Sequence, residues 1–272
     1  MNLEQTSRVL INSKILTNNF YFTSWIKLNF ASKRIKAGEY LIKKKFSVKS
    51  ITETLLLGKT LIRLFRLSEG DSKKQLYKKL SDIRPDLRSI ELPSNLIANT
   101  YGYTIHDDFL DIVNIIQNQS FLESKKIWDL RNKLIPLESI NELFILASII
   151  EKETGKNSEK SIIAGVFYNR LKKKMKLQSD PTVIYSITLG NEFNRKLSRK
   201  DLKFKSEYNT YHIKGLPPMP ICYPSYDTLL ATANPVNTDY LYFVADGKGG
   251  HLFSKSYKEH LKKIKNLKKN DN

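Results

Sequence analysis

The 272-residue chain contains few of the residues that cross-link or anchor a protein. Cys222 is the only cysteine, so an internal disulfide is excluded, and a single thiol is compatible with either redox compartment. A membrane-spanning helix needs about 20 consecutive apolar residues, whereas the most apolar N-terminal stretch, residues 9–30, is interrupted by Asn12, Lys14, Asn18, Asn19 and Lys27. This stretch also lacks the clean apolar segment of a secretory signal. The sequence therefore predicts neither a membrane span nor an export signal within this chain.

Patterns that bind metals or nucleotides are missing as well. The four histidines share no ligand spacing, and neither H-E-x-x-H nor C-x-x-C occurs. No glycine-rich phosphate loop or RNP-like strand is present either. We therefore expect no metal and no cofactor. His251 follows the glycine turn "GKGG" and is either a structural residue or a second acid–base group, and the structural role is the commoner one for a lone histidine.

What the chain does have is a strong excess of positive charge. Its 46 lysines and arginines outnumber 27 acidic residues, which gives a net charge of +19. This charge favours an acidic partner such as nucleic acid, anionic lipid or an acidic cell-wall polymer, unless it reflects only a lysine-rich composition. The length and the 40% hydrophobic content are typical of a globular protein. We expect two small domains rather than one large one.

Residues 1 to about 90 predict the short alternating elements of a small α+β module. In "SVKSITETLLLG", Ser47 or Ser50 is a suitable N-cap for a short amphipathic helix, and Gly58 is a suitable C-terminal residue. Residues 60–67, "TLIRLFRL", partly alternate between apolar and basic and predict a strand. A turn at Gly70 then leads into another short helix.

From about residue 105 the pattern becomes mainly helical. Residues 106–119 have apolar positions at helical spacing (Phe109, Ile112, Val113 and Ile116). The S-x-x-E sequence at 139–142 is typical of a capping box and predicts the start of the next helix. A third helix is expected over 159–175, followed by a strand at 239–246, a glycine turn and a basic terminal helix.

The stretch "ASIIEKETG", residues 147–155, ends an apolar helical run in two carboxylates. On a helical wheel Glu153 falls about 50° from the centre of the apolar stripe and Glu151 about 110° away. A carboxyl group held against apolar surroundings has a raised pKa and can remain protonated as a general acid. The alternative is that Glu153 is a solvated residue at a helix end, paired with one of the nearby lysines.

Several motifs, in order, resemble the YceG-like family of MltG-type endolytic murein transglycosylases. The resemblance covers about residues 143–260 and includes "LASIIEKETG", "IAGVFYNRL", "LQSDPTVIY", "YNTYHIKGLPPMP" and "YLYFVADGKGGHLFS". The upstream segments "IKAGEY" and "LSEG" are more weakly similar to the N-terminal part of that family. The resemblance implies an α+β fold with a LysM-like module over residues 1–92 and a lysozyme-like or lytic-transglycosylase-like catalytic domain over 93–272.

The resemblance also implies a reaction. Members of the family cleave the β-1,4 bond between N-acetylmuramic acid and N-acetylglucosamine within glycan strands, without water, and leave a 1,6-anhydromuramoyl end. The acid in such sites lies in a Glu-Ser or Glu-Thr pair at a helix terminus, which is Glu153-Thr154 here. Glu153 would protonate the leaving oxygen and then accept the proton of the muramoyl C6 hydroxyl. Glu151 is the alternative acid, or a residue that orients Glu153.

Candidate substrate contacts lie downstream of the acid. Gln178 and Thr182 have side chains suited to hydrogen bonds with N-acetyl groups. Asp180 precedes a proline and is expected to be an N-cap, with sugar contact as its second possible role. Asn209 and Tyr211 are expected to line a sugar groove, because similar segments do so in the family.

The expected partners follow from the same resemblance. They are peptidoglycan glycan strands as substrate and peptidoglycan synthases as neighbours, at the cytoplasmic (inner) membrane with the catalytic domain on its outer face, and no nucleic acid. The membrane anchor expected for the family is absent from this chain, and the family segment E-G-x-x-x-P-D-T-Y retains only Thr100 and Tyr101. The main alternative is a peptidoglycan-binding scaffold that has lost its activity. A nucleic-acid binder is supported only by charge and aromatic content.

Overall fold

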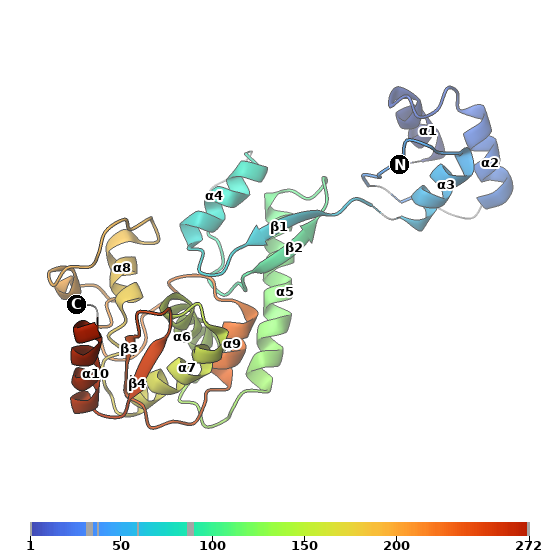
Figure 1. Ribbon diagram of the computed structural model, residues 1–272. Helices are drawn as coiled ribbons and strands as arrows, with labels where there is room; N and C mark the ends of the chain where they lie inside the picture. Colours follow the sequence, from blue (N-terminus) through green and yellow to red (C-terminus); the bar gives the residue numbers. More distant parts are fainter. Residues whose placement is uncertain (1, 31–34, 37, 59, 86–89, 271–272) are drawn as a thin grey trace. The chain divides into compact units, whose positions relative to one another are not determined.

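A computed structural model describes residues 2–30, 35–36, 38–58, 60–85 and 90–270 (Figure 1). The chain forms two compact units. Unit 1 comprises Met1–Phe65 and Gly102–Asp108, and unit 2 comprises Arg66–Tyr101 and Phe109–Asn272. Residues 66–92 therefore group with the C-terminal part, whereas the expected domain boundary was at 92. The assignment of a LysM-like module to residues 1–92 stays a prediction.

The described residues of unit 1 form three short helices, α1 (Leu3–Asn12), α2 (Phe20–Phe30) and α3 (Val48–Leu57). Their inner faces form one apolar cluster made of Leu10, Phe22, Ile26, Ile51 and Leu55. The predicted limits of α3 are confirmed, since the Ser47 side chain accepts a hydrogen bond from the Ser50 backbone N–H at 3.1 Å. Gly58 ends the helix at a φ of +65°, a left-handed conformation that glycine adopts without steric cost.

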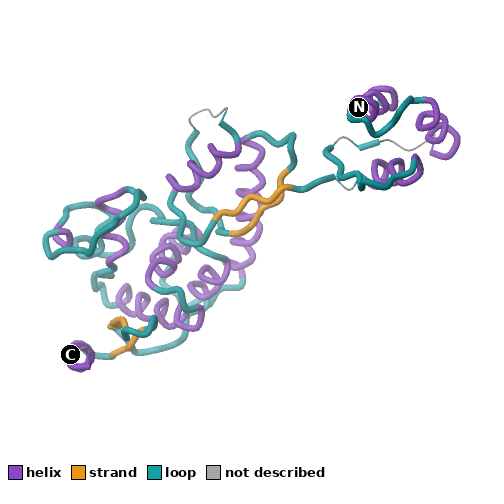
Figure 2. Tube along the Cα trace, turned by 45° about the horizontal axis from the view of Figure 1, so that its top comes forward, coloured by secondary structure: helices purple, strands orange, loops and turns teal. Residues whose placement is uncertain are grey.

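Strands β1 (Arg63–Leu67) and β2 (Asn99–Tyr103) pair in a two-stranded sheet, drawn as paired orange tubes in Figure 2. The strand predicted within residues 60–67 is therefore confirmed. Its alternation is visible in burial, because Phe65 and Leu67 are buried whereas Leu64 and Arg66 are exposed.

Unit 2 is mainly helical. Its helices are α4 (Lys73–Ile83), α5 (Phe109–Asp129), α6 (Ile140–Glu153), α7 (Asn157–Lys172), α8 (Asp180–Thr188), α9 (Tyr226–Ala233) and α10 (Tyr257–Asn270). Strands β3 (Tyr242–Ala245) and β4 (His251–Ser254) pair antiparallel and pack beside α10 (Figure 1). Together with the β1–β2 sheet, these elements confirm the expected α+β fold class.

Helix α6 forms the centre of unit 2. Every residue from Leu143 to Ile150 is buried, because α7, α8 and α9 all pack against this helix. Of the residues predicted to face inward from α5, all four are buried (Phe109, Ile112, Val113 and Ile116). The apolar part of α6 fixes the position of its last residue, Glu153, relative to three neighbouring helices.

Two local predictions need correction. Ser139 caps α6 by accepting from the Glu142 backbone N–H at 3.2 Å, but the Glu142 side chain accepts from Glu138 N–H at 2.6 Å and not from Ser139. The reciprocal half of the predicted capping box is therefore displaced by one residue. Likewise, the N-cap of α8 is Ser179, so Asp180 is the first helical residue and not the cap. Within the described ranges, no helix is both long and apolar enough to cross a membrane.

Candidate active site

Glu153 is the last residue of α6, and its carboxyl group is held inside unit 2. Its Oε1 accepts a short hydrogen bond from the Ser179 hydroxyl. Burial raises the pKa of Glu153 to about 7, and the negative charge of Asp180 acts in the same direction. The Ser179 hydrogen bond and the charges of His251 and Arg170 oppose this rise. The inward orientation predicted from the helical wheel agrees with this geometry, and the group can exchange a proton near neutral pH.

Ser179 is a residue of the site that the sequence analysis missed. It is the N-cap of α8 but makes no capping hydrogen bond, because its hydroxyl points to Glu153 instead. Its backbone N–H donates to the Thr210 hydroxyl at 2.9 Å, and its carbonyl accepts from the Thr182 hydroxyl at 2.6 Å. A serine directly before Asp-Pro is a good N-cap candidate, so the signal was present in the sequence.

Thr182 supports Ser179 from within the protein. Its side chain is fully buried, and its hydroxyl pairs with that of Thr210 at 2.8 Å. The Thr182 hydroxyl interacts with the Ser179 carbonyl and with the backbone N–H and hydroxyl of Thr210, so all of its hydrogen-bonding capacity is used. The expected contact between Thr182 and an N-acetyl group is therefore replaced by a positioning role.

Asn209 also forms its hydrogen bonds within the protein. It is fully buried, and its amide nitrogen donates to the carbonyls of Leu202 at 3.1 Å and Phe204 at 2.7 Å. Its amide oxygen accepts from the Tyr211 backbone N–H at 2.9 Å. Asn209 therefore fixes the loop that presents Tyr211, and its side chain does not line an open groove as expected.

Gln178, Asp180 and Tyr211 are the predicted substrate contacts that do reach the surface near Ser179. The Tyr211 hydroxyl donates to Asp180 Oδ1 at 2.7 Å, which joins two segments that are 31 residues apart. Gln178 is exposed and has a φ of +49°, a left-handed conformation that is uncommon outside glycine. Such backbone conformations concentrate at functional sites, where the surrounding structure holds them in place.

Glu151 has a separate environment on the same helix. Its carboxylate accepts hydrogen bonds from the Ser225 N–H at 2.7 Å, the Ser225 hydroxyl at 2.8 Å and the Thr228 hydroxyl at 2.5 Å. The Lys160 ammonium lies 3.3 Å away, and the two side chains are only 5% and 2% exposed. Burial tends to raise the pKa of Glu151, but the hydrogen bonds and Lys160 together bring it below its ordinary value. Glu151 is therefore held as a carboxylate, which disfavours it as the alternative general acid.

Arg170 and His251 both influence the charge of Glu153. Arg170 on α7 is 6% exposed and donates from Nε to the Leu241 carbonyl at 2.7 Å and from Nη1 to the Leu177 carbonyl at 2.5 Å. His251 at the start of β4 lies with Nδ1 2.7 Å from Glu159 Oε2. Arg170 was absent from the predicted site, because no local pattern relates it to Glu153, whereas His251 was considered only as a second acid–base group.

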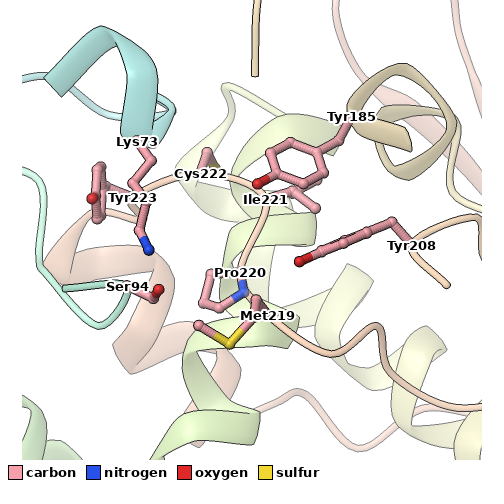
Figure 3. Close-up of a pocket in the computed structure, with 9 residues that line it drawn as sticks. All are labelled: Lys73, Ser94, Tyr185, Tyr208, Met219, Pro220, Ile221, Cys222 and Tyr223. Atoms are coloured by element: carbon pink, nitrogen blue, oxygen red, sulfur yellow. The ribbon is translucent and has the colours of Figure 1, made fainter. Parts of the chain in front are cut away.

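Two hollows are lined in part by residues of α8. A small cavity of about 70 Å³ is lined by the side-by-side rings of Tyr185 and Tyr208, with Lys73 opposite (Figure 3). It is far smaller than the roughly 300 Å³ or more of typical ligand sites. A second pocket of about 280 Å³ is lined partly by Lys152 and Pro181, the direct sequence neighbours of Glu153 and Asp180.

The arrangement offers one half-buried carboxyl group with a pKa near 7, a hydroxyl donor, and an arginine and a histidine nearby, which suits proton transfer to and from a bound substrate. Among the residues that the structure describes, no group of three or more His, Cys, Asp or Glu side chains could hold a metal ion.

Comparisons with known proteins give a consistent result. Residues 1–266 match the sequence profile of the YceG-like family. The chain is 34% identical to an endolytic murein transglycosylase of Bacillus subtilis, over 93% of the chain and 79% of that protein. It is 26% identical to an endolytic murein transglycosylase of Streptococcus pneumoniae, and there it spans about half of the relative, 54%. The crystal structure of a yceG-like protein from Listeria monocytogenes superposes with a TM-score of 0.63 at 28% identity, covering 96% of this chain and 95% of that one.

Proposed function

The chain belongs to the YceG-like family, and from this premise we propose that it is a lyase that cleaves glycan strands of peptidoglycan endolytically. The observation that carries the proposal is the position of Glu153. Its carboxyl group lies at the end of a buried helix, accepts a hydrogen bond from Ser179 and has a pKa of about 7. Both the family resemblance and the local geometry support Glu153 as the acid.

The first step is protonation of the leaving group. Protonated Glu153 donates its proton to the glycosidic oxygen, the bond from that oxygen to the muramoyl C1 breaks, and positive charge develops at C1. The carboxylate left on Glu153 is stabilised by the Ser179 hydrogen bond and by the charges of Arg170 and His251. Asp180 adds a negative charge near Glu153, which favours the protonated form that the step requires.

The second step needs no water. The C6 hydroxyl of the same muramoyl residue attacks C1, and its proton passes to the Glu153 carboxylate, which restores the acid. One C–O bond breaks and one forms, so the product carries a 1,6-anhydro ring. An intramolecular nucleophile has a high effective concentration, which removes the need for a second catalytic carboxylate. Glu151 accepts four hydrogen bonds from three residues, which agrees with a single-carboxylate scheme.

The proposal extends to cellular role and location through the family resemblance alone. Cleavage within a newly made strand would end its elongation, in the vicinity of peptidoglycan synthases and at the outer face of the cytoplasmic membrane. These points need tests of their own, such as fractionation of the producing cells and strand-length analysis in cells that lack the protein.

The reaction is tested by incubating the purified protein with polymeric glycan strands and analysing the products by mass spectrometry. We expect internal 1,6-anhydromuramoyl ends with wild type and a rate at least about 100-fold lower with Glu153→Gln. Glu151→Gln serves as the matched control, because it changes a neighbouring carboxylate on the same helix. Reducing ends in place of anhydro ends, or a fully active Glu153→Gln beside an inactive Glu151→Gln, would overturn the assignment.

A further inference from the structure

Glu159, near the start of α7, connects three segments around the candidate acid. Its Oε2 accepts a hydrogen bond from the Thr154 hydroxyl at 3.3 Å and lies 2.7 Å from His251 Nδ1. Its Oε1 accepts from the His251 backbone N–H at 3.0 Å. The His251 and Glu159 side chains are only 11% and 14% exposed. This two-point contact fixes both the backbone and the ring of His251.

The turn before His251 has a conformation that places His251 next to Glu159. Asp246 Oδ1 accepts hydrogen bonds from the N–H groups of Lys248 at 2.7 Å and Gly250 at 2.8 Å. A Cβ on Gly250 would lie 2.6 Å from Glu159 Oε1 and 2.7 Å from Lys156 Nζ. A side chain at position 250 would displace Glu159 or Lys156, so glycine at this position preserves the contact with His251.

Thr154 is the residue through which this contact reaches the acid. It is the C-cap of α6, is buried, and follows Glu153 directly. Its backbone N–H donates to the Ile150 carbonyl at 3.3 Å, and its hydroxyl accepts from the Lys156 N–H at 3.0 Å. Its bond to Glu159 thus helps to fix the point where α6 ends and where the Glu153 side chain begins.

We propose that Glu159 and His251 are positioning residues for Glu153. Glu159 binds both His251 and Thr154. Its contact with Thr154 holds the Glu153 carboxyl group beside Ser179, and its contact with His251 keeps the imidazole ring close enough to influence the charge of Glu153. The expected change in cleavage rate rests on the proposed function, whereas the expected change in the pKa of Glu153 does not. Neither residue needs to contact the substrate for this role.

The charged groups around Glu153 allow the effect of His251 to be measured as a change in the pKa of Glu153. Asp180 on α8 disfavours the Glu153 carboxylate, whereas Arg170 on α7 and His251 on β4 favour it. Tyr211 remains protonated and is hydrogen-bonded to Asp180, since burial raises its pKa. Removal of His251 should therefore raise the pKa of Glu153, because one favourable charge is lost while Asp180 remains.

The first test measures the pKa of Glu153 directly, by NMR titration of the full chain labelled with 13C-glutamate. Glu153 is assigned by comparison with Glu153→Gln. We expect His251→Gln to raise this pKa by about 0.5 unit or more, and the high-pH limb of the cleavage rate to move with it. His106→Gln is the matched control, since it removes an exposed histidine that belongs to unit 1. An unchanged Glu153 pKa in His251→Gln would overturn the proposal.

The second test separates positioning from packing. Thr154→Val keeps the shape of the side chain but removes its hydroxyl, whereas Thr154→Ser keeps the hydroxyl. We expect Thr154→Val to lower kcat about 10-fold with KM changed less than about twofold, and Thr154→Ser to restore most of the rate. Thermal melts verify that each variant is folded. Equal kcat in Thr154→Val and wild type would count against the link through Glu159.

The two proposals can fail separately. If wild type gives no anhydro ends, the proposed function is wrong, yet the NMR titration still decides whether His251 acts on Glu153. If wild type is active and neither His251→Gln nor Thr154→Val alters the Glu153 pKa or kcat, the reaction stands and the positioning role is wrong. Glu159→Gln provides a third variant should His251→Gln fail to fold.

Discussion

The hydroxyl of Ser179 donates a hydrogen bond to Oε1 of Glu153, which joins the N-cap of α8 to the last residue of α6 across 26 positions of sequence. Burial favours the protonated carboxyl, whereas this hydrogen bond favours the carboxylate. Their balance sets the pKa of Glu153 to about 7. A group that must donate a proton and then accept one in the same cycle works best with such a value.

Ser179→Ala should therefore impair catalysis and shift its pH dependence. Loss of the hydrogen bond raises the pKa of Glu153 further, so the decline of the rate at high pH shifts to a higher pH. The value of kcat at pH 7 should fall about 10-fold, because the Glu153 carboxylate formed in the first step is less well stabilised. The measurement is a pH–rate profile on glycan strands. Ser186→Ala is the control, because this serine also lies on α8 but donates only within its helix, to the Thr182 carbonyl at 2.7 Å. A wild-type profile for Ser179→Ala would contradict this role.

The pH dependence of wild type has a defined sign. Cleavage begins with protonated Glu153, whose pKa is about 7. The rate should therefore be nearly constant below that pH and fall about tenfold per unit well above it. Initial rates between pH 5 and 9 on insoluble peptidoglycan would check this, with strand binding measured in parallel to separate binding from chemistry. A rate that increases between pH 7 and 9 would exclude Glu153 as the acid.

The position of Glu153 could be predicted because it depends on local periodicity. The apolar residues of α6 define a stripe, and one carboxylate lies near that stripe. The environment of Glu151 could not be predicted in the same way. The wheel placed it at the flank, but Lys160, Ser225 and Thr228 enclose it from α7 and from the start of α9, so that its side chain is 5% exposed. Only the tertiary fold brings these segments together.

The predicted sugar contacts show a second limit of sequence reasoning. Polar residues in a motif near a cleft can either face the substrate or support the residues that do. Thr182 and Asn209 are fully buried with their hydrogen bonds satisfied, as buried polar groups generally are, while Gln178 and Asp180 are exposed. Residue type does not distinguish these roles, because a threonine or an asparagine suits both.

Glu153→Gln should make the protein more stable at alkaline pH. The pKa of Glu153 is about 7 in the folded state, against 4.5 for a free glutamate side chain, so between these values the folded protein binds more protons than the unfolded one. The stability of wild type therefore falls as pH rises from 4.5 to 7, by about 1–3 kcal/mol, and the amide avoids this loss. Urea unfolding at about pH 4.5 and about pH 8 would measure it.

The comparison between the two pH values provides the internal control for this prediction. At the lower pH the acid is largely neutral in the folded state, so wild type and Glu153→Gln should unfold at nearly the same urea concentration. At the higher pH wild type must bury the charged Glu153 carboxylate, whereas Glu153→Gln has no charge at this position and should be more stable. Equal stabilities at both pH values would mean that Glu153 is solvated when ionised, which would weaken its assignment as the acid.

The buried pair of Glu151 and Lys160 should contribute to stability rather than to proton transfer. Their side chains are 5% and 2% exposed and 3.3 Å apart, so Lys160→Met leaves a buried carboxylate without its cation and should cost about 3–5 kcal/mol. The double variant Glu151→Gln/Lys160→Met removes both charges and should recover part of this loss. Glu123→Ala is the control, since it breaks the exposed pair with Lys126 on α5 and should cost at most about 1 kcal/mol.

The contribution of this pair to stability also depends on pH. Because folding lowers the pKa of Glu151, the contribution of Glu151 is complete above its pKa in the unfolded chain and is lost as pH falls through its pKa in the folded protein. Urea unfolding of the four proteins at pH 7 measures these differences, and a Lys160→Met variant as stable as wild type would show that the pair is not buried in solution.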